Sequence, residues 1–232
     1  MAEDIRERLA RVREQVARTA EQVNRRPEEI TIIAVSKTFD SPVVQSAVDA
    51  GALDLGENRI QEAADKVGAI KGERLRWHLI GHLQSNKARL AARTFDVIHT
   101  IDSSELARRL DRIAGEEGRS LTVLAQVDLA HEPTKSGADE AELPEIVEAL
   151  DKAQHLKFKG LMTLPPFFDS PEQTRPYFRR LREILDELNR GRAAERRLTE
   201  LSMGMSHDFQ VAIEEGATTV RVGTAIFGAR KK

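Results

Sequence analysis

The chain has 232 residues, which is enough for one large domain, and its 36 basic and 38 acidic side chains nearly cancel. This balance argues against a nucleic-acid partner, and the absence of cysteine excludes disulfides, a thiol nucleophile and cysteine metal sites. Without a signal peptide or an apolar run near the roughly 20 residues that span a bilayer, the chain is expected to be cytoplasmic and to bind no membrane.

The first predicted element is an amphipathic helix over Asp4–Val23, because apolar side chains recur there every three or four residues. From Thr31 onward, short apolar and β-branched runs alternate with amphipathic helical segments to the end of the chain. The predicted strands are Thr31–Lys37, Leu53–Glu57, Arg76–Gly81, Val97–Ile101, Leu121–Asp128, Lys157–Thr163, Leu198–Met203 and Thr218–Val222.

Several predicted helices carry recognisable end signals. Ser41-Pro42 reads as an N-cap followed by proline at the first helical position. Ser170–Gln173 adds a capping box to the same arrangement. The helix that follows Ser103 is predicted to stop at Gly115 or Gly118.

Strands that alternate with helices predict a parallel sheet covered by helices, and continuous apolar strands such as Ile32–Val35 fit a sheet buried on both faces. A closed barrel and an open doubly wound sheet both fit this alternation. The eight strands favour a single (β/α)₈ barrel of the TIM type with an extra N-terminal helix. No linker or repeat divides the chain, so residues 1–232 are predicted to form one domain.

Polar residues gather just beyond the predicted strands, at the end where barrels carry their sites. Lys37 is the most distinctive of them, because it ends an apolar strand. A free lysine has a pKa of about 10.4, which desolvation or nearby cations lower toward about 7–8, so that the neutral amine can form a Schiff base. The alternative is a lysine whose ammonium only extends from the barrel rim into solvent.

The last two strands are followed by segments that suit a phosphate. Strand alternation places Arg221 and Gly223 on one face, and Thr224 adds a hydroxyl. A helical turn at Ala225–Phe227 can direct its N-terminus at an anion, and barrels usually hold phosphate at these two loops. The alternative is ordinary turn chemistry, with Ser206 capping the helix that follows it.

The histidines do not form a metal motif. His78 and His82 lie four residues apart across a strand and its loop, and His131-Glu132 lacks the second histidine of an H-E-x-x-H sequence. No Walker loop, dinucleotide fingerprint or G-x-S-x-G sequence is present. We therefore expect no metal site.

Taken together, a series of motifs resembles the pyridoxal phosphate homeostasis protein family, whose barrel is similar to the N-terminal barrel of alanine racemase. The resemblance covers nearly the whole chain, and the long tryptophan-containing motif is highly specific. The motifs are Ala34–Lys37, Gly56–Asn58, Trp77–Lys87, Lys135–Gly137, Gly160–Met162, Leu201–Ser206 and Val220–Gly228.

The resemblance implies a site for pyridoxal 5′-phosphate (PLP). Lys37 would hold the cofactor as an internal aldimine, and Arg221 would face the pyridine nitrogen. Ser206, Gly223 and Thr224 would bind the phosphate. With the residues near the phosphate and around the ring, the implied set is Lys37, Asn58, His82, Asn86, Ser202, Met205, Ser206, Arg221, Gly223 and Thr224.

Some positions depart from the family pattern and concern the polarity of the pocket rim. Arg59 stands where an aromatic residue is common, Asp128 where asparagine is common, and Thr163 where a small residue is common. Lys135 is a second lysine in a family motif, and transient contact with the cofactor is a hypothesis for it.

The resemblance implies a non-catalytic protein that carries or sequesters PLP, delivers it transiently to PLP-dependent apoenzymes, and supports PLP homeostasis. An arginine at the pyridine nitrogen weakens the electron sink, although racemases of similar fold also use one. A two-base racemase also needs a group opposite the lysine. Alanine racemases take a tyrosine for it from a separate C-terminal β-domain, whereas this chain ends a few residues after its last predicted strand.

The only tyrosine of this chain, Tyr177, follows Pro176 at a helix start and is predicted to pack. No catalytic residue is therefore assigned, and a monomer is expected. The alternatives are a PLP-dependent racemase or decarboxylase acting on a small substrate through an unidentified base, and a lysine aldolase.

Overall fold

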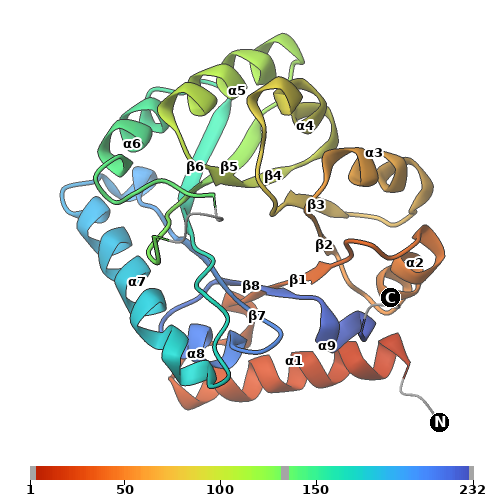
Figure 1. Ribbon diagram of the computed structural model, residues 1–232. Helices are drawn as coiled ribbons and strands as arrows, with labels where there is room; N and C mark the ends of the chain where they lie inside the picture. The colour runs from red at the N-terminus through yellow and green to blue at the C-terminus, as the bar shows by residue number, and fades with distance from the viewer. Residues whose placement is uncertain (1–3, 132–135, 230–232) are drawn as a thin grey trace.

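The computed structural model describes residues 4–131 and 136–229. Eight parallel strands pair in chain order, and β8 pairs back with β1 to close a barrel that helices surround (Figure 1). The predicted (β/α)₈ barrel is confirmed. The strands are β1 Thr31–Val35, β2 Asp54–Glu57, β3 Arg76–Leu79, β4 Val97–Ile101, β5 Leu121–Gln126, β6 Leu156–Met162, β7 Glu200–Met205 and β8 Thr219–Val222.

The helices lie between the strands in sequence and outside them in space (Figure 1). The α-helices in the described part of the chain are α1 Ile5–Gln22, α2 Ser41–Asp49, α3 Ile60–Ala69, α4 Ala88–Thr94, α5 Ser104–Glu116, α6 Leu143–Asp151, α7 Arg175–Asn189, α8 Phe209–Glu214 and α9 Thr224–Phe227. Short 3₁₀ turns are η1 Pro27–Glu29, η2 Ser85–Lys87, η3 Pro171–Thr174 and η4 Ala194–Arg196.

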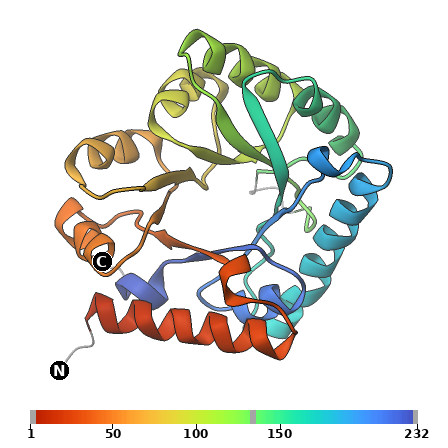
Figure 2. The same cartoon turned by 180° about the vertical axis from the view of Figure 1, so that it is seen from behind.

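The extra N-terminal helix is confirmed as α1, which Asp4 caps through a reciprocal capping box with Glu7. Its Leu9, Val12 and Val16 are buried. Burial of each such side chain contributes about 1.5–3 kcal/mol. The helix lies alongside α8 and α9 in both views (Figures 1 and 2). It therefore covers the seam where β8 meets β1.

All predicted strands are found, with ends that differ by a few residues. β1 ends at Val35 rather than Lys37, because the chain turns at Lys37-Thr38 and Thr38 adopts a left-handed φ of 71°. β7 runs to Met205, two residues beyond the predicted end at Met203. The polar residues expected at strand ends thus lie mostly in the turns that follow.

Both predicted serine N-caps, Ser41 and Ser170, are wrong, whereas Ser103 caps a helix although no cap was predicted there. Ser103 caps α5 by accepting a hydrogen bond from the Leu106 amide at 3.2 Å. For α2, Asp40 rather than Ser41 is the cap, because its carboxylate accepts from the Val43 amide and proline is tolerated anywhere in the first turn. Ser170 makes no capping hydrogen bond, since the residues after it form the 3₁₀ turn η3.

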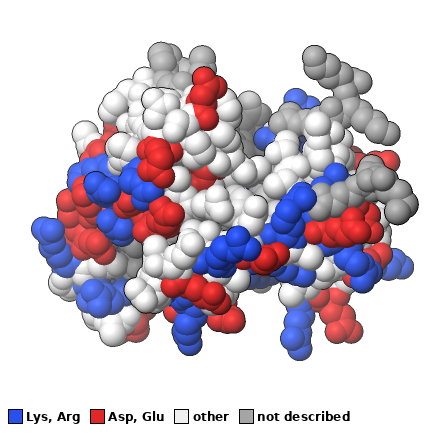
Figure 3. All heavy atoms as spheres, turned by 90° about the horizontal axis from the view of Figure 1, so that it is seen from below, with Lys and Arg blue, Asp and Glu red and all other residues white. Residues whose placement is uncertain are grey.

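The surface carries charge of both signs. The face seen from below Figure 1 shows acidic and basic side chains interspersed (Figure 3). Of the helices in residues 4–131 and 136–229, none is long and apolar enough to cross a membrane.

Candidate functional site

Lys37 lies directly after β1, in a half-buried turn at the C-terminal end of the barrel. The turn begins with the Ser36 amide, which donates to the Gly56 carbonyl of β2 at 3.0 Å. The Phe39 amide then donates back to the Ser36 carbonyl at 3.2 Å. These bonds place Lys37 where the sequence predicted it, at the barrel mouth.

Arg221 of β8 is buried inside the barrel, with only 3% of its surface exposed. Its guanidinium donates to Ser202 Oγ at 2.7 Å and to the Thr163 carbonyl at 2.8 Å. Burial lowers the pKa of Arg221 to about 10, so the group stays cationic at neutral pH. Two of its five N–H donors are used by these bonds to described residues, which leaves donors for a ligand.

A chain of buried hydrogen bonds extends from Arg221 through the barrel interior. His99 Nδ1 lies 2.9 Å from Ser202 Oγ, and His99 Nε2 lies 2.9 Å from His78 Nδ1. His78 Nε2 in turn lies 2.8 Å from Asp54 Oδ1. This series of hydrogen bonds thus joins strands β8, β7, β4, β3 and β2 across the core.

One arrangement of donors and acceptors satisfies every member of this hydrogen-bond series. Burial, with the nearby charge of Arg221, lowers the pKa of His99 well below its usual range, so His99 is neutral and donates from one nitrogen only. If Ser202 accepts from Arg221, its hydroxyl donates to His99 Nδ1. His99 Nε2 then donates to His78, whose Nε2–H donates to Asp54.

The carboxylate at the far end of this chain stays ionised. Burial opposes ionisation of Asp54, but hydrogen bonds from His78 and Arg76 outweigh it and lower the pKa of Asp54. His99 and Asp54 were not among the residues predicted for the site. The available signal was a polar residue inside an otherwise apolar strand.

The residues predicted to bind phosphate come together. Ser206 Oγ accepts hydrogen bonds from the amides of Gly223 at 3.1 Å and Ala225 at 3.3 Å, at the start of α9. Thr224 is exposed beside them. Ser206 does not cap the following helix, because Asp208 occupies that position and accepts from the Met205 amide at 2.6 Å.

The residues predicted around the ring lie on neighbouring loops, with different exposure. Asn58 follows β2, and its Oδ1 is buried with no hydrogen-bond partner among the described residues. The loop after β3 passes so close that a methyl group on Gly81 would lie 2.3 Å from the Asn58 carbonyl oxygen. His82 is exposed and pairs with Asp102 at 3.2 Å, and Asn86 is exposed in η2.

Met205 lines a hollow of about 300 Å³ at the mouth, together with Gln126, Ser136 and the loop after β6. The side-chain amide of Gln126 donates to the Ser136 carbonyl, which ties β5 to the start of the second described segment. Phe167 of the loop after β6 is 74% exposed beside this hollow. The rim of the mouth is therefore partly apolar.

The positions that depart from the family pattern change the rim little. The Thr163 hydroxyl donates to the Val127 carbonyl at 2.9 Å, so its polarity is satisfied by the sheet. Asp128 accepts from the Ala130 amide at 3.1 Å, and Arg59 is exposed. Lys135 lies outside the described residues.

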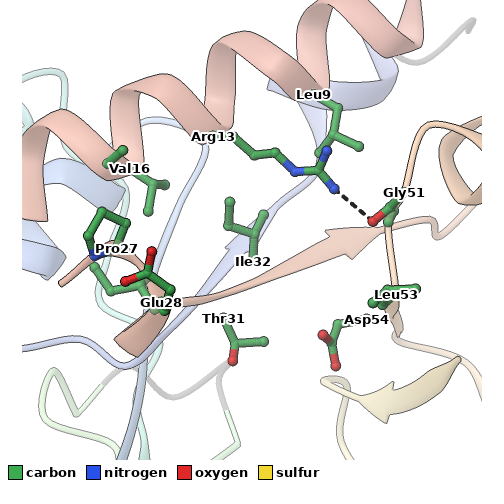
Figure 4. A pocket seen from close by; sticks show the side chains of 13 residues that line it. Leu9, Arg13, Val16, Pro27, Glu28, Thr31, Ile32, Gly51, Leu53 and Asp54 are labelled. Atoms are coloured by element: carbon green, nitrogen blue, oxygen red, sulfur yellow. Dashed lines mark hydrogen bonds between the residues drawn. The ribbon is translucent and has the colours of Figure 1, made fainter. Parts of the chain in front are cut away.

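A second hollow, of about 480 Å³, lies at the opposite end of the barrel (Figure 4). It lies between α1 and the N-terminal ends of β1 and β2, where Arg13 donates to the Gly51 carbonyl at 2.7 Å. The N-terminal face of such barrels generally serves stability rather than chemistry. The candidate site is therefore the mouth with Lys37 and Arg221.

Comparisons with known proteins show which family the chain resembles over nearly its whole length. A family model described as "Alanine racemase, N-terminal domain" matches residues 8–231. The "Pyridoxal phosphate homeostasis protein" of Aquifex aeolicus (strain VF5) is 42% identical over 225 residues, which cover 97% of this chain and 98% of that protein. The structure of PipY from Synechococcus elongatus PCC7942 without PLP is 44% identical, with a TM-score of 0.88 over 97% of this chain and 100% of that one. The structure of PipY with PLP bound has a TM-score of 0.84 and 42% identity over the same shares.

Replacing Gly81 by alanine should destabilise the barrel mouth. The added methyl would meet the Asn58 backbone, which cannot move as a side-chain tip can. We expect the free energy of unfolding to fall by about 1–3 kcal/mol in chemical denaturation. In the control Gly68→Ala, the methyl meets nothing within 4 Å on helix α3, and a gain of about 0.5–1 kcal/mol is expected. Equal losses in both variants would contradict the close approach.

Replacing Ser202 by alanine should break the buried chain. It removes the acceptor for Arg221 and the partner of His99 Nδ1 in a region closed to water. Denaturation should show a loss of about 1.5–3 kcal/mol, as for hydrogen bonds to charged groups. Ser46→Ala, which removes an exposed hydroxyl of α2, should change stability by about 0.5 kcal/mol or less. An unchanged free energy of unfolding in Ser202→Ala would show that these buried hydrogen bonds do not hold Arg221.

Proposed function

Because the chain belongs to the pyridoxal phosphate homeostasis protein family, whose barrel matches the alanine racemase N-terminal domain, we propose that it binds PLP and carries it without turning over a substrate. In this proposal the whole chain acts as one PLP-binding domain. The observation that carries it is the meeting, at one barrel mouth, of Lys37 with Arg221 and the Ser206–Gly223 pair.

The residues at the mouth fit the three chemical parts of this cofactor. PLP supplies an aldehyde that a primary amine attacks with loss of water, which gives a Schiff base, and we assign that amine to Lys37. The hydroxyls of Ser206 and Thr224 supply hydrogen-bond donors for the phosphate, and the amides of Gly223 and Ala225 hold Ser206 at the start of α9. The unpartnered Oδ1 of Asn58 is a buried acceptor available to a polar group on the ring.

Arg221 is the residue assigned to the pyridine nitrogen. As a buried cation with donors to spare, it donates to an unprotonated nitrogen and opposes its protonation. An unprotonated ring withdraws electrons from an attached amino acid less strongly. The same arginine that holds the cofactor therefore favours storage over carbanion chemistry.

The competing function, a racemase, needs a second acid–base group opposite Lys37. Tyr177 does not supply it, because it lies in α7 and stacks on Phe168 with ring centroids 6.0 Å apart. His82, paired with Asp102, is an exposed imidazole at the mouth and the residue on which a racemase proposal would depend.

The proposal extends to how the cofactor is used. The exposed rim at His82, Asn86 and Phe167 leaves the mouth accessible to another protein, which supports transient delivery to PLP-dependent apoenzymes. We further propose a monomer that acts in the cytoplasm, where such apoenzymes are made.

Covalent attachment is the first prediction of this proposal. Borohydride reduction of the PLP-loaded protein, followed by peptide mass mapping, should place a pyridoxyl group on Lys37. In Lys37→Ala the adduct should disappear, while weaker binding through the phosphate persists. An unmodified Lys37 in the loaded wild type would refute the assignment.

Absence of turnover is the second prediction. The loaded protein should not racemise alanine or other small amino acids at the rates of roughly 1–1,000 per second that are typical of enzymes. The measurement is circular dichroism or chiral chromatography of each amino acid over time. If turnover appears and is lost in His82→Ala, the racemase is the correct function.

A further inference from the structure

A buried ionic cluster lies between the barrel and helix α3, next to the turn that carries Lys37. Lys66 of α3 is 5% exposed, and its ammonium donates to Glu57 Oε1 at 2.7 Å and Glu62 Oε1 at 2.7 Å. Its third bond goes to the Ser36 carbonyl at 2.8 Å. An ammonium has three N–H donors, so Lys66 is fully engaged and is not an amine for the cofactor.

The cluster holds the peptide groups on both sides of Lys37. The preceding peptide is held at its carbonyl, that of Ser36, by Lys66. The following peptide is held at its amide, because Thr38 N–H donates to Glu62 Oε1 at 2.5 Å. The same oxygen of Glu62 accepts from Lys66, so one ion pair fixes the backbone before and after Lys37.

The turn that the cluster holds is one that the local sequence does not favour. Thr38 is β-branched and has a φ of 71°, in the left-handed region that such residues rarely adopt. Strain of this kind persists where surrounding contacts determine the backbone. The contacts here include the Ser36 hydroxyl, which donates to Glu57 Oε1 at 2.7 Å.

A simple anchoring role for α3 explains this cluster less well. Apolar side chains at both Lys66 and Glu57 would fill the space without burying a charge, and replacement of a whole buried ion pair often leaves stability unchanged or improved, whereas loss of Lys66 alone leaves the Glu57 carboxylate unpaired. Burial raises the pKa of Glu57, whose second oxygen is buried without a partner among the described residues. The ionic cluster is therefore costly, and what it adds over apolar packing is the fixed position of two particular peptide groups.

We propose that Lys66, acting with Glu62, is a positioning residue that presents the Lys37 amine to the aldehyde of PLP. The inference rests on the proposed function and adds to it the group that sets the geometry of the covalent bond. Fixing the backbone on both sides of Lys37 sets the point and direction from which its side chain extends into the mouth. Small displacements of a reacting group are costly, so loss of the cluster should weaken attachment specifically.

The test compares two ligands that differ only at the aldehyde. Lys66→Met should bind PLP about 10- to 100-fold more weakly than the wild type in absorbance titrations, with less adduct on Lys37 after borohydride. Pyridoxine 5′-phosphate has the same ring and phosphate but no aldehyde. Its affinity for Lys66→Met should stay within about twofold of the wild-type value, because Arg221 and Ser206 do not depend on the cluster.

Two further variants complete the design. Glu62→Ala removes the acceptor for Thr38 N–H but leaves Lys66 paired with Glu57, and alanine suits the first turn of α3, so this variant tests the idea even if Lys66→Met does not fold. It should show the same selective loss for PLP. Lys152→Met, at an exposed lysine paired with Glu148 on α6, is the matched control and should bind both ligands normally.

Hydrogen exchange supplies a readout that needs no cofactor. In Glu62→Ala the Thr38 amide should exchange about tenfold faster or more, while amides of the barrel strands stay protected. Unchanged PLP binding in the folded variants, or a parallel loss of both ligands, would overturn the positioning role. A wild-type protein that takes up no PLP would instead refute the proposed function, which is a different and separately visible result.

Discussion

The structure of the site depends on one constraint, a guanidinium cation that is enclosed in the barrel and bonds to no carboxylate within residues 4–131 and 136–229. Arg221 is met by a hydroxyl and a backbone carbonyl, which leave its charge only partly compensated. An unpartnered buried charge is very costly, so each contact must itself be well supported. Ser202 can serve as an acceptor because His99 takes its proton, and His99 depends in turn on His78. The series of hydrogen bonds through the barrel core therefore follows from the burial of Arg221.

A second group of buried charges lies beside the turn at Lys37, between the outside of the barrel and helix α3. There the buried groups carry full and opposite charges, and they hold the backbone rather than a ligand. Ser36 lies on the side of this cluster, since it bonds to Glu57 and Lys66, and Lys37 follows it in the turn at the barrel mouth. The two polar systems are separated by β1 and β2, so each can be altered without breaking the other.

The barrel could be predicted from sequence because short apolar and β-branched runs alternate with amphipathic helical segments, and that pattern is local. The strand ends were predicted less accurately, because residues such as Lys37 lie in the turn that follows the strand and not in the strand itself. The pairing of His78 with His99 could not be predicted, because they come together only through the register of β3 with β4, where His78 lies beside Val97. Lys66 gave no signal either, since a lysine on an amphipathic helix is ordinarily solvated. Motif resemblance identified the residues of the mouth but not those that support them.

The inner end of the site is rigid and its rim is exposed, and under the proposed function this difference bears on how bound PLP would be released. Inside the barrel, Arg221 and the residues hydrogen-bonded to it are buried and hold one another in place, so this end has little freedom. At the rim, Thr224, His82 and Asn86 are exposed and touch few described groups. An enzyme that stabilises a carbanion needs a closed, dry site around the reacting carbon. Under the proposed function, a mouth that is rigid below and open above would retain PLP by its ring and phosphate while leaving its covalent bond within reach of an incoming amine, which is the property that transfer to another protein requires.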